Sequence, residues 1–271
     1  MELINEHTHT GLTGHGHGSI AEVVSAADDA NIRVLAITEH FPLSSEIDPT
    51  NFVSMPMHVL DTYCDQIIEE RTLHPSMDIL VGTELDWLGA YEDRDLAAID
   101  WGRFDIILGS VHYLDLWPFD DPDQAGYWDE VGHDAIWEKY FDQFCKACVS
   151  DMPYTVMSHP DLVKKFDKYP SKAFNRHRAY CDAAEAAKTG ERMIEVNTSG
   201  AVYPCKELYP HIDLLTEFRK AGVPATLGTD AHEPRFVNRG IDAGLKLLYE
   251  AGYRELTAVL PGGDRRSIPL V

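Results

Sequence analysis

Residues 33–40 read Arg-Val-Leu-Ala-Ile-Thr-Glu-His, an apolar run that ends in three polar side chains. A run of this length is typical of a strand that is buried on both faces in a parallel sheet. The same pattern recurs along the whole chain. The predicted strands are Glu2–Glu6, Arg33–Thr38, Asp78–Gly82, Phe104–Gly109, Tyr154–Met157, Arg192–Val196 and Val223–Leu227.

Helical patterns lie between many of these runs. The first begins at Ser19 and has Glu22 three residues later, which is the pattern of a capping box. The predicted helices are Ser19–Ala30, Met57–Leu73, Ala135–Val149, Ser171–Thr189, Leu208–Ala221 and Arg239–Ala251. The alternation of strand and helix over the chain favours a closed parallel α/β barrel. An open doubly wound sheet is the alternative, and the absence of a glycine-rich phosphate loop after any strand weakens it. We expect residues 1–271 to form a single domain.

One long segment, Tyr113–His133, has no clear periodicity and is rich in Asp, Pro, Gly and aromatic residues. A loop of this length inside a compact domain is usually functional or mobile. We therefore expect it to border the site.

The charge balance limits the partners. Of the 271 residues, 23 are Lys or Arg and 45 are Asp or Glu, which gives a net charge of −22. Because this field repels polyanions, we expect no nucleic-acid partner, and any bound phosphate needs local cations or metal ions. The start of the chain lacks the features of a signal peptide, and no apolar stretch reaches the roughly 18 to 20 residues of a membrane span. We expect a cytoplasmic protein without a membrane partner.

The five cysteines are few and scattered, which is typical of reduced cytosolic thiols. Cys145 and Cys148 would share one face of a helix, but no second pair accompanies them. We therefore interpret this pair as packing residues and not as metal ligands.

Histidines and carboxylates gather where the predicted strands end. The motifs are His7-Thr8-His9, followed by His15 and His17; Thr38-Glu39-His40; Gly82-Thr83-Glu84; Ser110-Val111-His112; Ser158-His159-Pro160-Asp161; and Gly228-Thr229-Asp230-Ala231-His232. In a parallel barrel these carboxyl-terminal strand ends converge on one face. Buried imidazoles and carboxylates need compensation, which divalent metal ions supply. A lone histidine is more often structural, and we interpret His58, His74, His133, His177 and His211 in that way.

These motifs resemble those of the PHP (polymerase and histidinol phosphatase) superfamily, in the same order and over almost the whole chain. Within that superfamily the sequence is most similar to the histidinol-phosphatase branch, on the segments Gly109–Asp120, His159–Lys164 and Glu195–Gly200. The resemblance implies a distorted (β/α)7 barrel with its site at the carboxyl-terminal ends of the strands. It also implies three divalent metal ions per chain, for which imidazole and carboxylate ligands suit Zn, Fe or Mn.

The resemblance also assigns ligands position by position. One metal would take His7, His9, Glu84 and Asp230; a second would share Glu84 and take His112 and His159; the third would take His15, His40 and His232. His15 is preferred to His17 because it keeps the expected offset after His9.

The implied activity is hydrolysis of L-histidinol phosphate to L-histidinol and phosphate, a step of histidine biosynthesis, by a metal-bound hydroxide. Glu84 and His232 would act at the metals, and Asp161 or a metal-bound water would protonate the leaving alkoxide. The predicted contacts with this small phosphorylated substrate are Lys164, Arg235, Trp117 and Asn197, with Lys165 also near the site.

The chain departs from the family pattern after Asn197–Gly200, where Ala201-Val202-Tyr203-Pro204 stands in place of the usual Leu-Arg. Arg235 or Lys206 would then hold the phosphate, or the ester would differ. One alternative is therefore a PHP phosphoesterase for another small monophosphate or a nucleotide.

Two further alternatives are disfavoured. A catalytically silent PHP binding module predicts missing ligands, but every matched ligand position is filled. An amidohydrolase usually has a carbamylated lysine on a middle strand, and no lysine ends the third, fourth or fifth predicted strand.

Overall fold

A sheet of seven parallel strands organises the computed structural model, which describes residues 2–270. Each strand is hydrogen-bonded in parallel to the next. In spatial order the strands are β1 (Leu3–Asn5), β2 (Ile32–Ile37), β3 (Asp78–Asp86), β4 (Ile106–Ser110), β7 (Val156–Met157), β8 (Met193–Asn197) and β9 (Ala225–Gly228). Strand β3 runs four residues beyond the predicted end at Gly82, so Glu84 lies within the strand and not after it.

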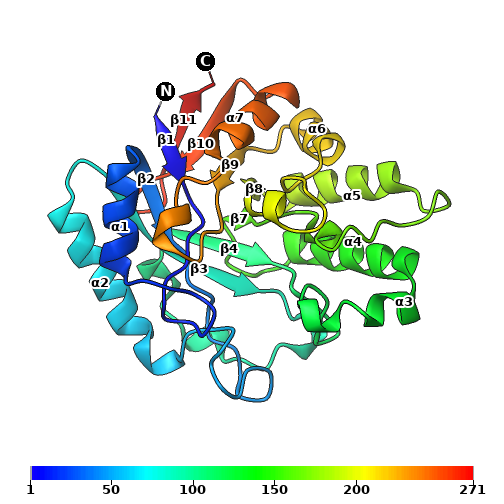
Figure 1. Ribbon diagram of the computed structural model, residues 1–271, viewed down its shortest axis with the longest axis horizontal. Coiled ribbons are helices and arrows are strands. Elements are labelled where there is room, and N and C mark those ends of the chain that lie inside the picture. The colour runs from blue at the N-terminus through cyan, green and yellow to red at the C-terminus, as the bar shows by residue number, and fades with distance from the viewer. Residues whose placement is uncertain (1, 271) are drawn as a thin grey trace.

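The two edges of this sheet meet. The Glu6 amide donates to the Leu227 carbonyl, and the Asp230 amide donates to the His7 carbonyl, each at 2.9 Å. The first and last strands therefore lie side by side, and the sheet forms a nearly closed barrel with helices outside it (Figure 1). The predicted barrel is confirmed over the open sheet.

Most of the helices lie close to the predicted ones. The main differences from the predicted helices are the residues at which the helices begin. They are α1 (Ile20–Asp29), α2 (Leu60–Leu73), α3 (Tyr127–Val131), α4 (His133–Val149), α5 (Arg176–Thr189), α6 (Ile212–Ala221) and α7 (Ile241–Glu250). The capping box of Ser19 and Glu22 is present at α1. Helix α5 begins at Arg176 because the Asn175 side chain caps it, and His211 caps α6 in the same way.

Short 3₁₀ helices fill several connections. They are η1 (Met57–Val59), η2 (Gly89–Tyr91), η3 (Leu96–Ala98), η4 (Trp101–Arg103), η5 (Pro122–Gln124), η6 (Leu162–Lys164), η7 (Ser199–Val202) and η8 (Pro234–Phe236). Among the described residues, no helix is both long enough and apolar enough to cross a bilayer.

The segment Tyr113–His133 is more ordered than its sequence suggests. It contains a hairpin of β5 (Tyr113–Leu114) and β6 (Trp117–Pro118), followed by η5 and α3. The Trp128 indole is buried and donates to the Phe119 carbonyl at 2.9 Å. The elements are too short to show a period, and tertiary packing holds them.

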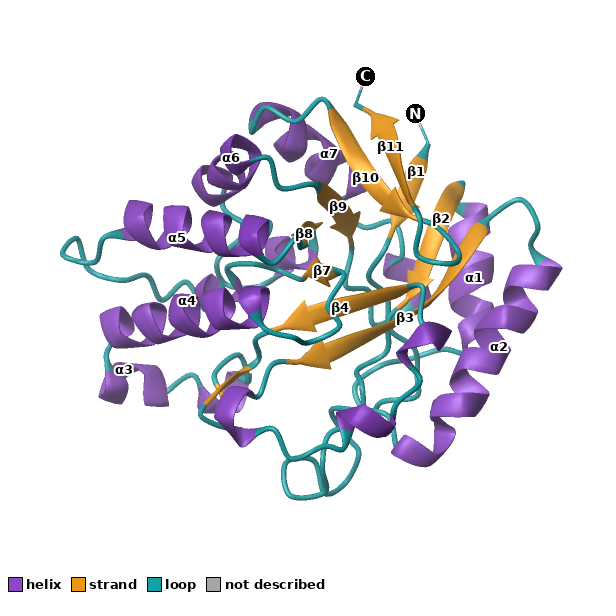
Figure 2. Cartoon of the chain, turned by 180° about the vertical axis from the view of Figure 1, so that it is seen from behind, coloured by secondary structure: helices purple, strands orange, loops and turns teal. Residues whose placement is uncertain are grey.

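An antiparallel hairpin, β10 (Glu255–Val259) and β11 (Arg265–Pro269), was not predicted. It lies beside β1 (Figure 2). The buried Glu6 carboxylate accepts hydrogen bonds from the Val259 amide at 2.6 Å and from the Thr226 hydroxyl at 2.5 Å. This side chain therefore ties β1 to both β9 and the hairpin.

Candidate metal centre

The carboxyl-terminal ends of the barrel strands bring the predicted ligands together. His7 and His9 follow β1, His40 follows β2, and Glu84 lies near the end of β3. His112, His159, Asp230 and His232 follow β4, β7 and β9. Most of these side chains are buried, and His232 is the most exposed of the eight at 27%.

Four donor groups form the tightest cluster. His7 Nε2 lies 3.1 Å from His9 Nε2, and each of these atoms lies 3.3 Å from a Glu84 oxygen. An Asp230 oxygen lies 3.3 Å from His9 Nε2 and 3.7 Å from His7 Nε2. Ligands about 2.0 Å from a tetrahedral divalent ion are about 3.3 Å from one another. The four groups therefore fit one metal ion.

The second Glu84 oxygen belongs to a neighbouring group. It lies 2.9 Å from His159 Nε2 and 3.5 Å from His112 Nε2. The Ser110 hydroxyl donates to the same oxygen at 2.6 Å. Glu84 therefore belongs to both donor groups and would be the ligand shared between them if metal ions bind there.

The three histidines predicted for a third ion, His15, His40 and His232, lie near one another. The ring centroid of His15 lies 5.2 Å from that of His40 and 4.7 Å from that of His232. His9 stacks between His40 and His232, and His9, His40 and His232 are the three whose donor nitrogens approach one another within 4.8 Å. His9 thus borders two of the proposed metal positions. His15 lines the cavity, whereas His17 is exposed.

Two carboxylates that orient these histidines were missed. Glu195 Oε1 lies 2.8 Å from His7 Nδ1, and Asp86 Oδ1 lies 2.7 Å from His112 Nδ1. Such contacts fix the ring orientation of a metal ligand. Alternation could have found both, because Asp86 lies two residues after Glu84 on β3 and Glu195 is the middle residue of β8.

The buried carboxylates and imidazoles of this cluster favour the binding of cations. Burial alone would lower the pKa of His7, but Glu195, Glu84 and Asp230 outweigh it and raise this pKa to about 10. Burial lowers the pKa of His232 to about 3, so this ring is a neutral donor at pH 7. Within residues 2–270, Nδ1 of His9, His40 and His159 is buried without a hydrogen-bond partner. A bound metal would replace protons on the charged rings.

A cavity of about 650 Å³ opens above these donors. Its walls include Phe52, Tyr113 and Tyr203, and Lys165 contributes a cation. The Lys165 ammonium lies 2.9 Å from Asp120 Oδ2 and 4.7 Å from the centre of the Tyr203 ring. The dimensions suit a small metabolite.

Two predicted site residues lie away from this cavity. Lys164 and Asp161 both have fully buried side chains and form an ion pair of 3.0 Å. The Lys164 ammonium also donates to the Leu208 carbonyl at 2.7 Å and lies 3.2 Å from Glu207. The predicted roles of Lys164 in phosphate binding and of Asp161 as the acid do not fit these positions, because both groups are occupied inside the protein.

The other predicted substrate contacts do not line the cavity formed by the described residues. Arg235 is 71% exposed and pairs with Glu233. Trp117 packs edge-on against Tyr127. Asn197 is buried and donates to Glu195 Oε2 at 3.0 Å, so it positions the carboxylate that orients His7. Lys165, next to Lys164, is the cation that reaches the cavity.

Fold and site together define a class: parallel α/β barrels with a histidine and carboxylate cluster at the carboxyl-terminal strand ends. The family model of the PHP domain matches residues 5–199, and the chain belongs to this family. The family predicted from the strand-end motifs is thereby confirmed.

The similar proteins span the same length as this chain. A probable histidinol-phosphatase of Deinococcus radiodurans is 29% identical over 260 residues, covering 94% of this chain and 96% of the relative. The histidinol-phosphatase of Bacillus subtilis is 25% identical, covering 91% of this chain and 99% of the relative. The structure of a histidinol phosphate phosphatase from Lactococcus lactis, complexed with Zn, L-histidinol and phosphate, superposes with a TM-score of 0.81. It is 21% identical and covers 98% of this chain and 99% of that chain, so it shows the same fold.

Proposed function

We propose that this protein is a metal-dependent histidinol-phosphate phosphatase, which hydrolyses L-histidinol phosphate to L-histidinol and phosphate in the cytoplasm. The observation that carries the proposal is the cavity with the ligand cluster at its base and Lys165 in its wall. The relatives named histidinol-phosphatase, which match over nearly their whole length, support the substrate. The five free thiols are consistent with the reducing cytoplasm.

The proposal includes three ions: one held by His7, His9, Glu84 and Asp230, a second by Glu84, His112 and His159, and a third by His15, His40 and His232, whose ring centroids lie within 6.0 Å of one another. When bound, such ions lower the pKa of water and neutralise phosphate oxygens. Glu195 and Asp86 hold His7 and His112 in the orientation that this requires. Zn, Fe and Mn all suit these ligands.

The residues around the cavity match the two ends of the substrate. Lys165 is 13% exposed, and its ammonium can bind a phosphate oxygen while Asp120 holds its position. Glu46, Asp121 and Asp123 also line the cavity. Histidinol carries an amine and an imidazole, and these carboxylates attract a cationic group.

The substrate is tested with a panel of phosphate esters. We expect L-histidinol phosphate to have the highest kcat/KM, and we expect phosphate release to stop after treatment with a chelator and to return when metal is added. Released phosphate and the metal content of the purified protein are measured together. A higher kcat/KM for another monophosphate would favour the alternative phosphoesterase. Bound metal without hydrolysis of any ester would favour a binding module.

Lys165 is tested by substitution. We expect Lys165→Gln to lower kcat/KM for L-histidinol phosphate by about 10- to 100-fold, because a hydrogen bond to a charged group contributes about 1.5 to 3 kcal/mol. The control is Arg235→Ala, which removes an exposed cation outside the cavity and should change kcat/KM less than about twofold. If Arg235→Ala had the larger effect, the assignment of phosphate binding to Lys165 would be wrong.

A further inference from the structure

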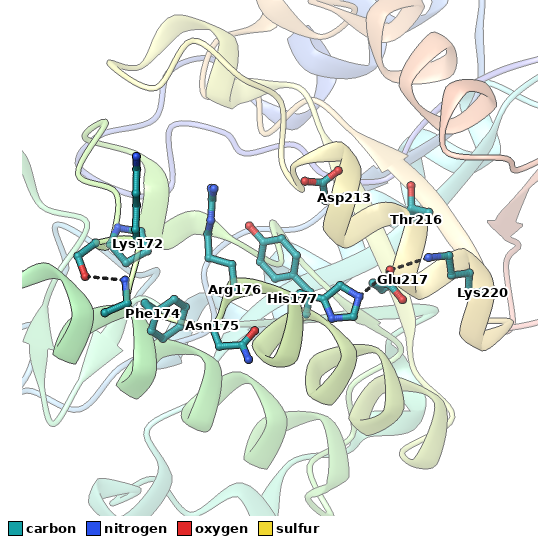
Figure 3. Close-up of a pocket in the computed structure, with 13 residues that line it drawn as sticks. Lys172, Phe174, Asn175, Arg176, His177, Asp213, Thr216, Glu217 and Lys220 are labelled. Carbon is teal, nitrogen blue, oxygen red and sulfur yellow. Dashed lines mark hydrogen bonds and ion pairs between the residues drawn. The ribbon is translucent and has the colours of Figure 1, made fainter.

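A second group of possible metal ligands lies outside the barrel, between α5 and α6. His177 and Cys181 are one turn apart on α5, and Glu217 faces them from α6. Cys181 Sγ lies 3.8 Å from His177 Nδ1 and 3.8 Å from Glu217 Oε2. His177 Nε2 lies 3.8 Å from Glu217 Oε1. Figure 3 shows His177 and Lys220 on either side of Glu217.

Local contacts favour this arrangement of donors. Residues four apart on a helix lie on the same face, so His177 and Cys181 present their side chains together. Lys220 donates to Glu217 Oε1 at 2.7 Å, which leaves Oε2 directed at the cysteine thiol. Glu217 is only 15% exposed, whereas His177 is 78% exposed and can rotate toward an ion. The spacings are a few tenths of an ångström wider than those of bound zinc ligands.

We propose that His177, Cys181 and Glu217 bind one divalent ion of the zinc class, at a site separate from the metal centre of the barrel. Imidazole, thiolate and carboxylate are all zinc ligands, and three of them leave one position open. On binding, the thiol loses its proton to solvent and the sulfur forms a bond to the metal. The thiolate and the carboxylate then cancel the two positive charges of the ion.

His177 and Glu217 line a cavity of about 800 Å³ that also contains Lys172 and Arg176. Water or a small anion can complete the coordination there. Because the ligands come from two helices, the bound ion would also link α5 to α6.

Cobalt binding provides a test that distinguishes this site from the metal centre of the barrel. The ligands predicted for the barrel are histidines and carboxylates, so a cobalt–thiolate charge-transfer band in the near ultraviolet would report a cysteine site alone. Among the donor groups found within residues 2–270, the one between α5 and α6 is the one that contains a cysteine. The experiment adds Co²⁺ to the metal-loaded enzyme and follows this band.

We expect the band to saturate at one cobalt per chain and to disappear when excess Zn²⁺ is added. Cys181→Ser should abolish it, and His177→Ala should weaken cobalt binding by about 10- to 100-fold or more. The matched control is Cys145→Ser, which removes a partly buried thiol from α4 and should leave the band intact. Absence of the band at saturating Co²⁺, or its persistence in Cys181→Ser, would overturn the proposal.

Discussion

Glu84→Gln is expected to abolish phosphatase activity, with a loss in kcat of about 10³-fold or more. Both oxygens of this carboxylate lie within 3.5 Å of imidazole nitrogens. One oxygen faces His7 and His9, and the other faces His112 and His159. An amide offers one oxygen and no negative charge, so it cannot bridge two cations. The substitution should therefore also reduce the metal content of the purified protein. Phosphate release and elemental analysis measure the two effects.

Glu138→Gln is the matched control for this experiment. Glu138 lies exposed on α4, outside the barrel, and the same chemical change there should leave both activity and metal content unchanged. If Glu84→Gln kept its full complement of metal and more than a tenth of the activity, the bridging role would have to be abandoned.

Lys164→Met is expected to destabilise the fold by about 3 to 5 kcal/mol, because it leaves the buried Asp161 carboxylate without its ion-pair partner. The residual hydrogen bond from the His211 amide at 2.7 Å does not compensate a full charge. Denaturation by urea, followed by circular dichroism, measures the loss. At a temperature where the variant is folded, KM for the substrate should be unchanged.

Two further variants distinguish the effect of burial on stability from the effect of the unpaired charge. Lys139→Met removes a surface cation that pairs with Asp115 and should cost less than about 1 kcal/mol. The double variant Lys164→Met with Asp161→Asn should recover part of the stability, because it removes the unpaired charge. A large rise in KM with little loss of stability in Lys164→Met would instead indicate that this lysine binds substrate.

The ligand cluster could be predicted from the sequence because a parallel barrel carries all carboxyl-terminal strand ends to one face. It did not matter that β3 was predicted too short, since Glu84 still falls on that face. Of the two orienting carboxylates, Asp86 lies on β3 with Glu84, and Glu195 lies on β8, which carries no predicted metal ligand. The signal for their roles is the alternation of side chains along β3 and β8, which places Asp86 on the same face of β3 as Glu84.

The substrate contacts were harder to predict because they follow from local chain direction. Lys164 and Lys165 are adjacent, but Lys164 points into the protein interior and Lys165 points into the cavity. The 3₁₀ helix η6 (Leu162–Lys164) sets this difference, and its three residues carry no distinctive pattern. The sequence placed both lysines near the site, with Lys164 as the predicted contact, whereas Lys165 is the one that lines the cavity.

The closure of the barrel also sets the order in which the site can be completed during protein synthesis. His7 and His9 leave the ribosome among the first residues, but their backbone partners are Asp230 and Ala231. Until those residues have been made, β1 lacks its neighbour β9 and the histidine pair lacks the Asp230 carboxylate. The predicted ligands within the first 159 residues therefore wait for the last two, Asp230 and His232. We therefore expect metal loading to follow the synthesis of Asp230 and His232.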